Sequence, residues 1–374
     1  MNILQTCYSP AWGGMELQAL EVCRRLLRRG QRVTLSCPPG TRIANEAGRH
    51  NIPLLTFAVH GYFNPITAIR LARELRRRTI DIIHCQHSRD IATVVPAMLL
   101  SGKRRPILLS KGVGSYINKK DFLHRLTHRY INRILAISDV IHRNILETLP
   151  VSPERVLTLH DSIDTTRFSP EHARGDAVRR EFGFSNTVLL IGFVGRYSPG
   201  KGHEELLRAA AILKPRFPDV RYLVVGEASY GEGRYEADIK RLAVELGVND
   251  VVTFAGFRND IPDVMAACTA FAFPSHAEAF GVVLVEALAM GLPVVSTNCD
   301  GVLDIMVDGE TGLMVPPKNP EELARGLGCL LEDPALRTRL GKAGRARALE
   351  MFDEEKLTDR LEQIYRDVLA EQRF

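Results

Sequence analysis

The sequence predicts an α/β protein made of two Rossmann-like β/α/β domains that face a central cleft. Two observations indicate this fold class. Short apolar runs, typical of buried parallel strands, alternate with helical segments through both halves of the chain. The alternation is interrupted over residues 161–186, where Pro170, Gly175, Gly183 and mixed charges are typical of a linker. The chain of 374 residues is also long enough for two domains of ordinary size.

In the first half, seven runs are expected to be strands and three longer segments to be helices. Strands separated by helices form a parallel, doubly wound sheet. The expected strands are residues 3–7, 32–37, 54–57, 81–84, 107–110, 134–137 and 156–159, and the expected helices are residues 15–29, 66–78 and 91–100.

The second half repeats this alternation and ends in a mostly helical tail, residues 320–370. We therefore expect a first domain at 1–165, a second at 166–352, and a C-terminal helix at 353–374 that packs back toward the first domain. The expected strands of the second domain are residues 188–194, 221–225, 251–254, 270–273 and 294–296.

The composition is that of a soluble globular protein, with 25% charged and 45% hydrophobic residues. No apolar run approaches the roughly 18 residues that a membrane-spanning helix needs. The N-terminal residues lack the basic region of a signal peptide, and seven scattered cysteines suggest free thiols in a reducing compartment. We expect a cytoplasmic protein.

Charge is distributed unevenly between the halves. Residues 1–165 contain 24 Lys and Arg against 12 Asp and Glu, whereas the remainder contains 25 against 32. The basic half indicates either an anionic partner or an arginine-rich surface without one.

The basic segment 116–133 could be a helix lying peripherally on the inner face of an anionic membrane. The alternative is an amphipathic helix packed on its own domain. Nucleic acid is disfavoured, because no nucleic-acid-binding motif accompanies the charge.

Glu286 is the most unusual acid of the chain. Residues 281–290 suit a helix that follows the strand 270–273, and the neighbours of Glu286 are apolar on nearly every face. A carboxylate there costs several kcal/mol unless a donor binds it. Glu286 is therefore either hydrogen-bonded within the core or exposed to solvent. The alternative is that it faces a ligand crevice at the carboxyl ends of the strands.

Residues 274–286 resemble the signature of glycosyltransferase family 4, the retaining nucleotide-sugar transferases of GT-B fold. The residues that carry the resemblance are Pro-Ser-x-x-Glu-x-Phe-Gly and a second glutamate. The resemblance implies that Glu286 binds the ribose hydroxyls of the donor and that Glu278 lies beside the donor sugar. The intervening Ala279, Phe280, Gly281 and Val282 would line the donor site.

Residues 195–202, Gly-Arg-Tyr-Ser-Pro-Gly-Lys-Gly, nearly match a P-loop, but Gly202 lacks the hydroxyl that would hold Mg²⁺. Glycines that allow close approach, with Arg196 and Lys201 as cations, predict a diphosphate site. The resemblance implies that these cations neutralise the leaving diphosphate. The alternative is a tight turn with two surface cations.

Two loops of the first half complete the resemblance. Gly13 and Gly14 resemble the family's glycine-rich loop near the donor phosphates, although a glycine pair also fits an ordinary turn. In the loop after residues 81–84, a family histidine lies near the reacting carbon of the sugar. We favour His87 for this role, with His84 as the alternative that packs in the core.

Phe257 and Arg258 resemble the family segment whose backbone recognises the base of the nucleotide. No Asp-x-Asp pair occurs in the sequence, so no metal and no cofactor are expected, and Arg196 and Lys201 would do the electrostatic work directly.

The resemblance implies a retaining, metal-independent hexosyltransferase, with His87, Glu278, Arg196 and Lys201 as catalytic residues. Its donor would be a nucleotide-diphosphate sugar, and its acceptor a glycan or glycolipid of a bacterial envelope polysaccharide or lipopolysaccharide. The alternatives are a nucleotide-sugar epimerase or hydrolase of the same fold, or a nucleotide-sugar-binding protein without turnover.

Overall fold

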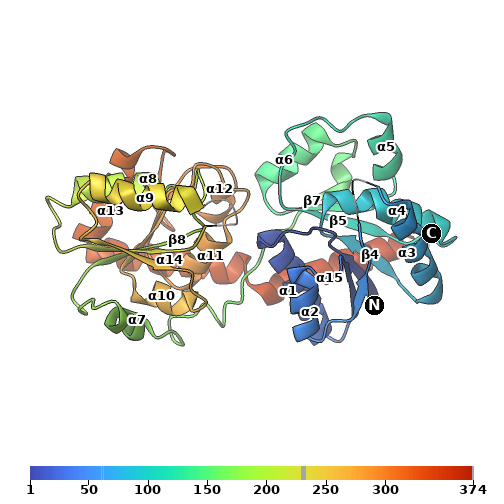
Figure 1. Ribbon diagram of the computed structural model, residues 1–374, viewed down its shortest axis with the longest axis horizontal. Coiled ribbons are helices and arrows are strands. Elements are labelled where there is room, and N and C mark those ends of the chain that lie inside the picture. The colour runs from blue at the N-terminus through green and yellow to red at the C-terminus, as the bar shows by residue number, and fades with distance from the viewer. Residues whose placement is uncertain (60, 62, 229–232, 373–374) are drawn as a thin grey trace. The chain divides into compact units, whose positions relative to one another are not determined.

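The computed structural model describes residues 1–59, 61, 63–228 and 233–372 and divides the chain into two compact units. The first unit comprises Met1–Asp161 together with Glu355–Phe374, and the second comprises Ser162–Glu354. Each unit contains one parallel sheet with helices packed on it, which confirms the predicted fold class (Figure 1).

The first unit has a seven-stranded sheet in the order β3-β2-β1-β4-β5-β6-β7. Its strands are β1 (Asn2–Thr6), β2 (Arg32–Cys37), β3 (Leu54–Thr56), β4 (Ile82–Cys85), β5 (Ile107–Lys111), β6 (Arg133–Ala136) and β7 (Val156–Thr158). Its helices are α1 (Gly14–Arg28), α2 (Arg42–Arg49), α3 (Pro65–Arg77), α4 (Ile91–Leu100), α5 (Phe122–His128), α6 (Asp139–Thr148) and α15 (Glu354–Glu371).

The second unit has a six-stranded sheet in the order β10-β9-β8-β11-β12-β13. Its strands are β8 (Leu190–Val194), β9 (Arg221–Val225), β10 (Val252–Gly256), β11 (Ala270–Phe273), β12 (Val294–Thr297) and β13 (Leu313–Val315). Its helices are α7 (Gly175–Glu181), α8 (His203–Leu213), α9 (Gly233–Glu245), α10 (Ile261–Ala267), α11 (Val282–Ala289), α12 (Val302–Ile305), α13 (Pro320–Glu332) and α14 (Pro334–Met351).

Both sheets follow the strand order of a Rossmann fold, which reverses direction once. The reversal lies between β1 and β4 in the first unit and between β8 and β11 in the second. In open α/β sheets, ligands bind beside the carboxyl ends of the strands at such a switch point. The topology therefore predicts that ligands bind at the loops after β1, β4, β8 and β11.

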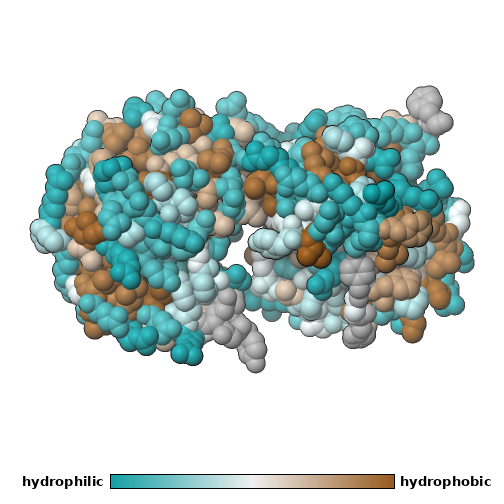
Figure 2. All heavy atoms as spheres, turned by 90° about the horizontal axis from the view of Figure 1, so that it is seen from above, coloured by the Kyte–Doolittle hydropathy of each residue, from teal (hydrophilic) through white to brown (hydrophobic). Residues whose placement is uncertain are grey.

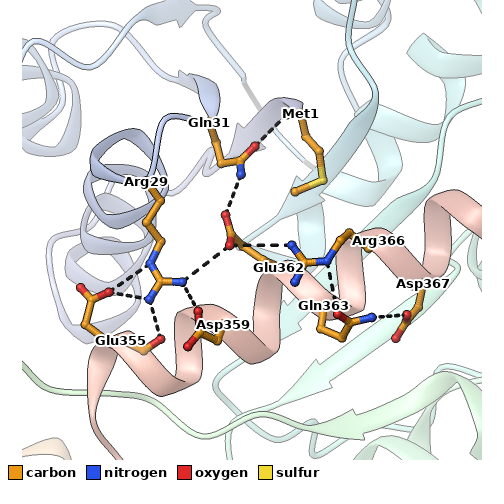
Figure 3. Close-up of polar contacts among 9 residues, drawn as sticks. All are labelled: Met1, Arg29, Gln31, Glu355, Asp359, Glu362, Gln363, Arg366 and Asp367. Carbon is orange, nitrogen blue, oxygen red and sulfur yellow. Dashed lines mark hydrogen bonds and ion pairs between the residues drawn. The ribbon is translucent and has the colours of Figure 1, made fainter.

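Helix α15 belongs to the first unit although it is the last helix of the chain. Its Tyr365 and Val368 are fully buried in the core shared by α1, α2 and the sheet. At the surface, Arg29 bonds the Glu355 carbonyl at 2.8 Å and also contacts the carboxylates of Glu355 and Asp359 (Figure 3). Buried apolar contacts and surface ion pairs thus hold α15 on this unit.

Two sequence-based expectations were wrong. Residues 161–186 do not form a simple linker, because they contain α7, whose Val178 is buried in a core cluster with Val264 of α10. Segment 116–133 is not one long helix: only Phe122–His128 is helical, and β6 begins at Arg133. The Asp121 side chain accepts a hydrogen bond from the His124 amide and caps the helix, so α5 begins at Phe122 rather than at residue 116.

Candidate functional site

The loops after β8 and β11 touch at the switch point of the second unit. The His276 amide donates to the Gly200 carbonyl at 2.8 Å. Gly202 has φ +84°, and a Cβ at this position would lie 2.1 Å from the Pro274 carbonyl oxygen. Only glycine fits there, which explains physically why the P-loop pattern lacks its Ser or Thr.

Lys201 and Glu278 are brought together across these two loops. The Lys201 Nζ donates to Glu278 Oε2 at 2.6 Å, and both side chains remain partly exposed. Arg196 is exposed in the same loop as Lys201. An anion arriving here would compete with Glu278 for the ammonium group.

Tyr197 anchors the loop after β8. Its ring is fully buried and stacks on the His203 ring, with centroids 4.6 Å apart and an interplanar angle of 19°. Burial lowers the pKa of His203 to about 4, helped by the charge of Lys201, so this imidazole is neutral near pH 7. The Tyr197–His203 stack holds the loop against the core, whereas Arg196 and Lys201 of the same loop remain accessible.

Glu286 lies on α11, which is buried at Leu284, Val285, Ala287 and Leu288, as predicted. The Glu286 carboxylate has no hydrogen bond or ion pair among the described residues. Burial raises its pKa to about 8, and the nearby charge of Arg167 opposes this rise. A half-buried carboxylate without donors is suited to accept hydrogen bonds from a ligand's hydroxyl groups.

The other residues expected to line a donor site lie between Glu278 and α11. Ala279 and Val282 are half-buried, and Phe280 is buried edge-on against Phe352 with centroids 5.6 Å apart. Gly281 has φ +112°, a conformation that favours glycine, at the start of the helix.

Phe257 and Arg258 follow β10 in the same unit. The Phe257 side chain is exposed, whereas the Arg258 guanidinium is engaged by Glu181 and Asp260, which raise its pKa. The Arg258 side chain is thus committed to neighbouring acids, consistent with a role for the backbone of this segment.

In the first unit, the loops after β1 and β4 carry Gly13, Gly14 and His87, whereas His84 lies in β4 itself. Gly13 precedes α1 and Gly14 begins it. His84 is buried in the sheet, where its ring nitrogens contact Tyr365 at 2.6 Å and Ser110 at 2.8 Å. Burial lowers the pKa of His84 to about 3, so it is a neutral core residue.

His87 lies further into the loop and its side chain is 25% exposed. Of the two histidines, His87 is therefore the accessible one.

Sequence reasoning missed Asp90, Arg167 and a pair formed by His276 Nε2 and Glu205 Oε1, 2.8 Å apart. Asp90 could have been noticed as an acid that follows His87 at the start of a helix. His276 stands between Ser275 and Glu278 within the quoted signature. Arg167 gave no signal, because its relation to Glu286 depends on the tertiary fold.

Among the residues that the structure describes, no group of three or more His, Cys, Asp or Glu side chains is arranged to hold a metal ion. None of the helices in the described part of the chain combines the length and apolar character that a bilayer crossing needs.

Solved structures share the fold of the whole chain. A glycosyltransferase of Rickettsia africae superposes with a TM-score of 0.90 at 21% identity and covers 98% of both chains. HepE of Anabaena, solved in complex with UDP, has a TM-score of 0.87 at 24% identity, covering 98% of this chain and 100% of its own. The fold is that of GT-B glycosyltransferases.

Relatives by sequence are named D-inositol 3-phosphate glycosyltransferases. The Mycobacteroides abscessus protein is 31% identical over 365 residues, 85% of this chain and 77% of that protein. The Acidothermus cellulolyticus protein is 28% identical over 395 residues, 96% and 87% of the two chains. The match to the Saccharomonospora viridis protein, 34% identical, spans only 64% of this chain and 56% of that protein.

Two family models match successive parts of the chain. The model described as glycosyl transferases group 1 matches residues 176–347, and the model described as Glycosyltransferase Family 4 matches residues 12–167. With the matching fold and relatives, these findings show that the chain belongs to glycosyltransferase family 4.

Proposed function

We propose that this protein transfers a sugar, with retention of anomeric configuration, from a nucleotide-diphosphate sugar to a phosphorylated or glycolipid acceptor. The observation that carries the proposal is Glu286, a half-buried carboxylate without donors on α11, the helix that follows the loop in which Glu278 pairs with Lys201. Ribose hydroxyls would satisfy Glu286. The solved complexes of HepE with UDP and with UDP-glucose support a nucleotide-sugar donor.

Each residue has a defined part in this reaction. Arg196 and Lys201 bind the diphosphate and stabilise the charge that grows on it as the glycosidic bond breaks. Glu278 orients the donor sugar once the diphosphate has taken its place beside Lys201. His87 stabilises the positive charge that develops on the sugar, and the segment at Phe257 holds the base.

The acceptor is the least defined substrate. The relatives' name makes D-inositol 3-phosphate one candidate, and WaaG, a structural neighbour described as involved in lipopolysaccharide biosynthesis, makes an envelope glycan another. D-inositol 3-phosphate is anionic, which suits the net positive charge of residues 1–165.

Proton NMR of fresh product from an α-linked donor tests the reaction. We expect an α-linked product and equal rates in EDTA and in Mg²⁺, because two cations replace the metal. A β-linked product, or activity lost in EDTA and restored by Mg²⁺ or Mn²⁺, would contradict the mechanism. Isomerised or hydrolysed donor would instead favour an epimerase or hydrolase, and affinity without turnover would favour a binding protein.

We further propose that the first unit contacts an anionic membrane surface through α5 and the turn before it. Five apolar residues there are more than half exposed: Val113, Tyr116, Ile117, Phe122 and Leu123. The alternative of an amphipathic helix packed on its own domain would bury such side chains. Figure 2, which views the side that carries α5, shows hydrophobic residues lying among hydrophilic ones.

Basic pockets adjoin this surface. A pocket of about 230 Å³ after α5 is lined by five arginines and one acid, Glu371, which pairs with Arg133; the other arginines are Arg104, Arg105, Arg129 and Arg155. A second, more open one is lined by Lys120 and Arg125. Exposed apolar side chains between arginines and lysines suit the interface of a bilayer with anionic headgroups.

Vesicle flotation tests this contact. We expect binding to phosphatidylglycerol-containing vesicles but not to pure phosphatidylcholine, with loss in high salt and in Ile117→Ser/Phe122→Ser. Ile66→Ser is the matched control, because Ile66 is 62% exposed on α3 of the same unit. Equal binding by the control and the double variant, or no binding to either vesicle, would rule the contact out.

A further inference from the structure

Asp90 lies buried beneath the switch point of the first unit, in a position that the proposed roles do not use. It is 1% exposed and ends a short 3-10 turn, Ser88–Asp90, that leads into α4. Its carboxylate accepts a hydrogen bond from the Thr6 hydroxyl at 2.7 Å and from the Tyr8 amide at 3.3 Å. The carboxylate therefore ties the end of β1 to the loop after β4.

The same carboxylate faces His87. Asp90 Oδ1 lies 3.5 Å from His87 Nδ1, and the His87 carbonyl accepts a hydrogen bond from the Asp90 amide at 2.9 Å. His87 Nδ1 is shielded from solvent and has no hydrogen-bond partner among the described residues, and the Asp90 carboxylate is the acidic group that faces it. The exposed quarter of the side chain must then lie elsewhere on the ring.

The buried Asp90 carboxylate favours the tautomer of His87 in which Nδ1 carries the proton. Burial raises the pKa of Asp90, while His87, Thr6 and the Tyr8 amide oppose the rise by contacting its oxygens. With the proton on Nδ1, the imidazole donates to Asp90 and Nε2 keeps a lone pair. A carboxylate that fixes the tautomer of a functional histidine in this way also fixes the orientation of its ring.

We infer that Asp90 is a positioning residue that holds His87 in the Nδ1–H tautomer, with Nε2 open as an acceptor for a hydroxyl group of the donor sugar. The inference rests on the proposed role of His87 in sugar transfer. Because Asp90 also bonds β1, it fixes this acceptor relative to the loop that carries Gly13 and Gly14.

The nitrogen chemical shifts of ¹⁵N-histidine-labelled protein test the tautomer without any substrate. At a pH where His87 is neutral, we expect its Nδ1 to carry the proton, with the signal assigned by its loss in His87→Gln. In Asp90→Ala the proton should move to Nε2, since a buried N–H would otherwise lack an acceptor. Asp121→Ala is the matched control, because Asp121 contacts His124 Nδ1 in the same unit.

Transfer kinetics provide the second readout. We expect Asp90→Ala to lower kcat about 10- to 100-fold, because a misplaced catalytic group costs this much, while nucleotide affinity stays near wild type. An Nε2–H tautomer in the wild-type chain would overturn the inference, and this outcome does not depend on whether Asp90→Ala folds. A changed tautomer with an unchanged kcat would uphold the positioning by Asp90 and refute the proposed role of His87.

Discussion

At the scale of single residues, Glu286 combines a cost to stability with a use in binding. Its pKa of about 8 exceeds the ordinary glutamate value of 4.5, so the folded state binds its proton more tightly than the unfolded state. Protonated Glu286 therefore makes its whole contribution to the free energy of unfolding below pH 4.5. This contribution is lost as the pH rises through about 8. Bound ribose would supply the donors that the ionised carboxylate lacks.

We therefore expect Glu286→Gln to raise the melting temperature at pH 9, where wild-type Glu286 is ionised, and to change it little at pH 5. The stabilisation should be on the order of 1 kcal/mol or more. Nucleotide binding should weaken by roughly 10- to 100-fold, the value of about 1.5–3 kcal/mol for hydrogen bonds to a charged group.

Scanning calorimetry across pH and titration calorimetry with UDP, GDP and ADP measure the two effects separately. Unchanged affinity for every nucleotide would remove Glu286 from the binding site. A melting difference that does not grow with pH would show that its carboxylate is not desolvated.

Lys201 makes a contact that a ligand must break. Its pair with Glu278 is partly exposed, and such pairs contribute only about 0–1 kcal/mol to stability. We therefore expect Lys201→Ala to leave the melting temperature nearly unchanged and to lower kcat about 10²–10³-fold, the typical effect of losing one group that stabilises transition-state charge.

The matched control is Lys214→Ala. Lys214 pairs with Asp250 at 2.6 Å near the other end of α8 and should leave turnover unaffected. Steady-state kinetics distinguish the outcomes: a raised KM with unchanged kcat would assign Lys201 to ground-state binding alone.

At the scale of elements, all strands except β13 were predictable, whereas several helices and loops were not. Buried parallel strands are continuous apolar runs, so β1, β8 and β11 are visible in the sequence. The short β13 and the helix α7 carry little pattern, because their stability comes from tertiary packing.

For the site, sequence spacing placed Lys201 and Glu278 at strand ends, but it could not reveal that they touch. The sequence favoured His87 over His84 by its place in the loop, but it could not show what holds His84 in the core. That contact depends on Tyr365, far away in the sequence, whose hydroxyl occupies the Nδ1 of His84.

The contact between the loops after β8 and β11 restricts position 202 to glycine. Gly202→Ser would complete the P-loop pattern, yet it would place a Cβ 2.1 Å from the Pro274 carbonyl oxygen in a backbone with φ +84°. We expect it to destabilise the protein by about 1–3 kcal/mol or more and to create no Mg²⁺-dependent ATP binding.

Gly328→Ala on α13 of the same unit is the control, because its Cβ would meet only Leu213, at an ordinary 3.6 Å. Thermal unfolding measures the loss of stability, and ATP titration with Mg²⁺ tests for nucleotide binding. A stable Gly202→Ser protein that binds Mg·ATP would show that the two loops are free to separate.

At the scale of the whole molecule, the first unit is built from both ends of the chain. It leaves that unit at Asp161 and returns at Glu355, so α15 supplies core side chains to a sheet formed by the first part of the chain. Tyr365 links the two parts, because its hydroxyl contacts Gln5 at 3.1 Å and His84 at 2.6 Å.

Because Tyr365 is fully buried, we expect Tyr365→Ala to cost about 3–5 kcal/mol, the range for truncating a large core side chain. The loss should fall on the first unit, since the described contacts of Tyr365 lie there. Amide hydrogen exchange resolved along the chain should therefore show faster exchange in β1, β4 and α15, with protection of β8, β11 and α11 unchanged.

Arg29→Ala serves as the comparison for this experiment. Arg29 fixes the same helix, but through partly exposed ion pairs, each of which contributes at most about 1 kcal/mol (Figure 3). We expect it to accelerate exchange mainly in the first turns of α15. If both variants loosened the two units equally, the units would unfold as one cooperative body, and α15 would stabilise the whole chain rather than the first unit alone.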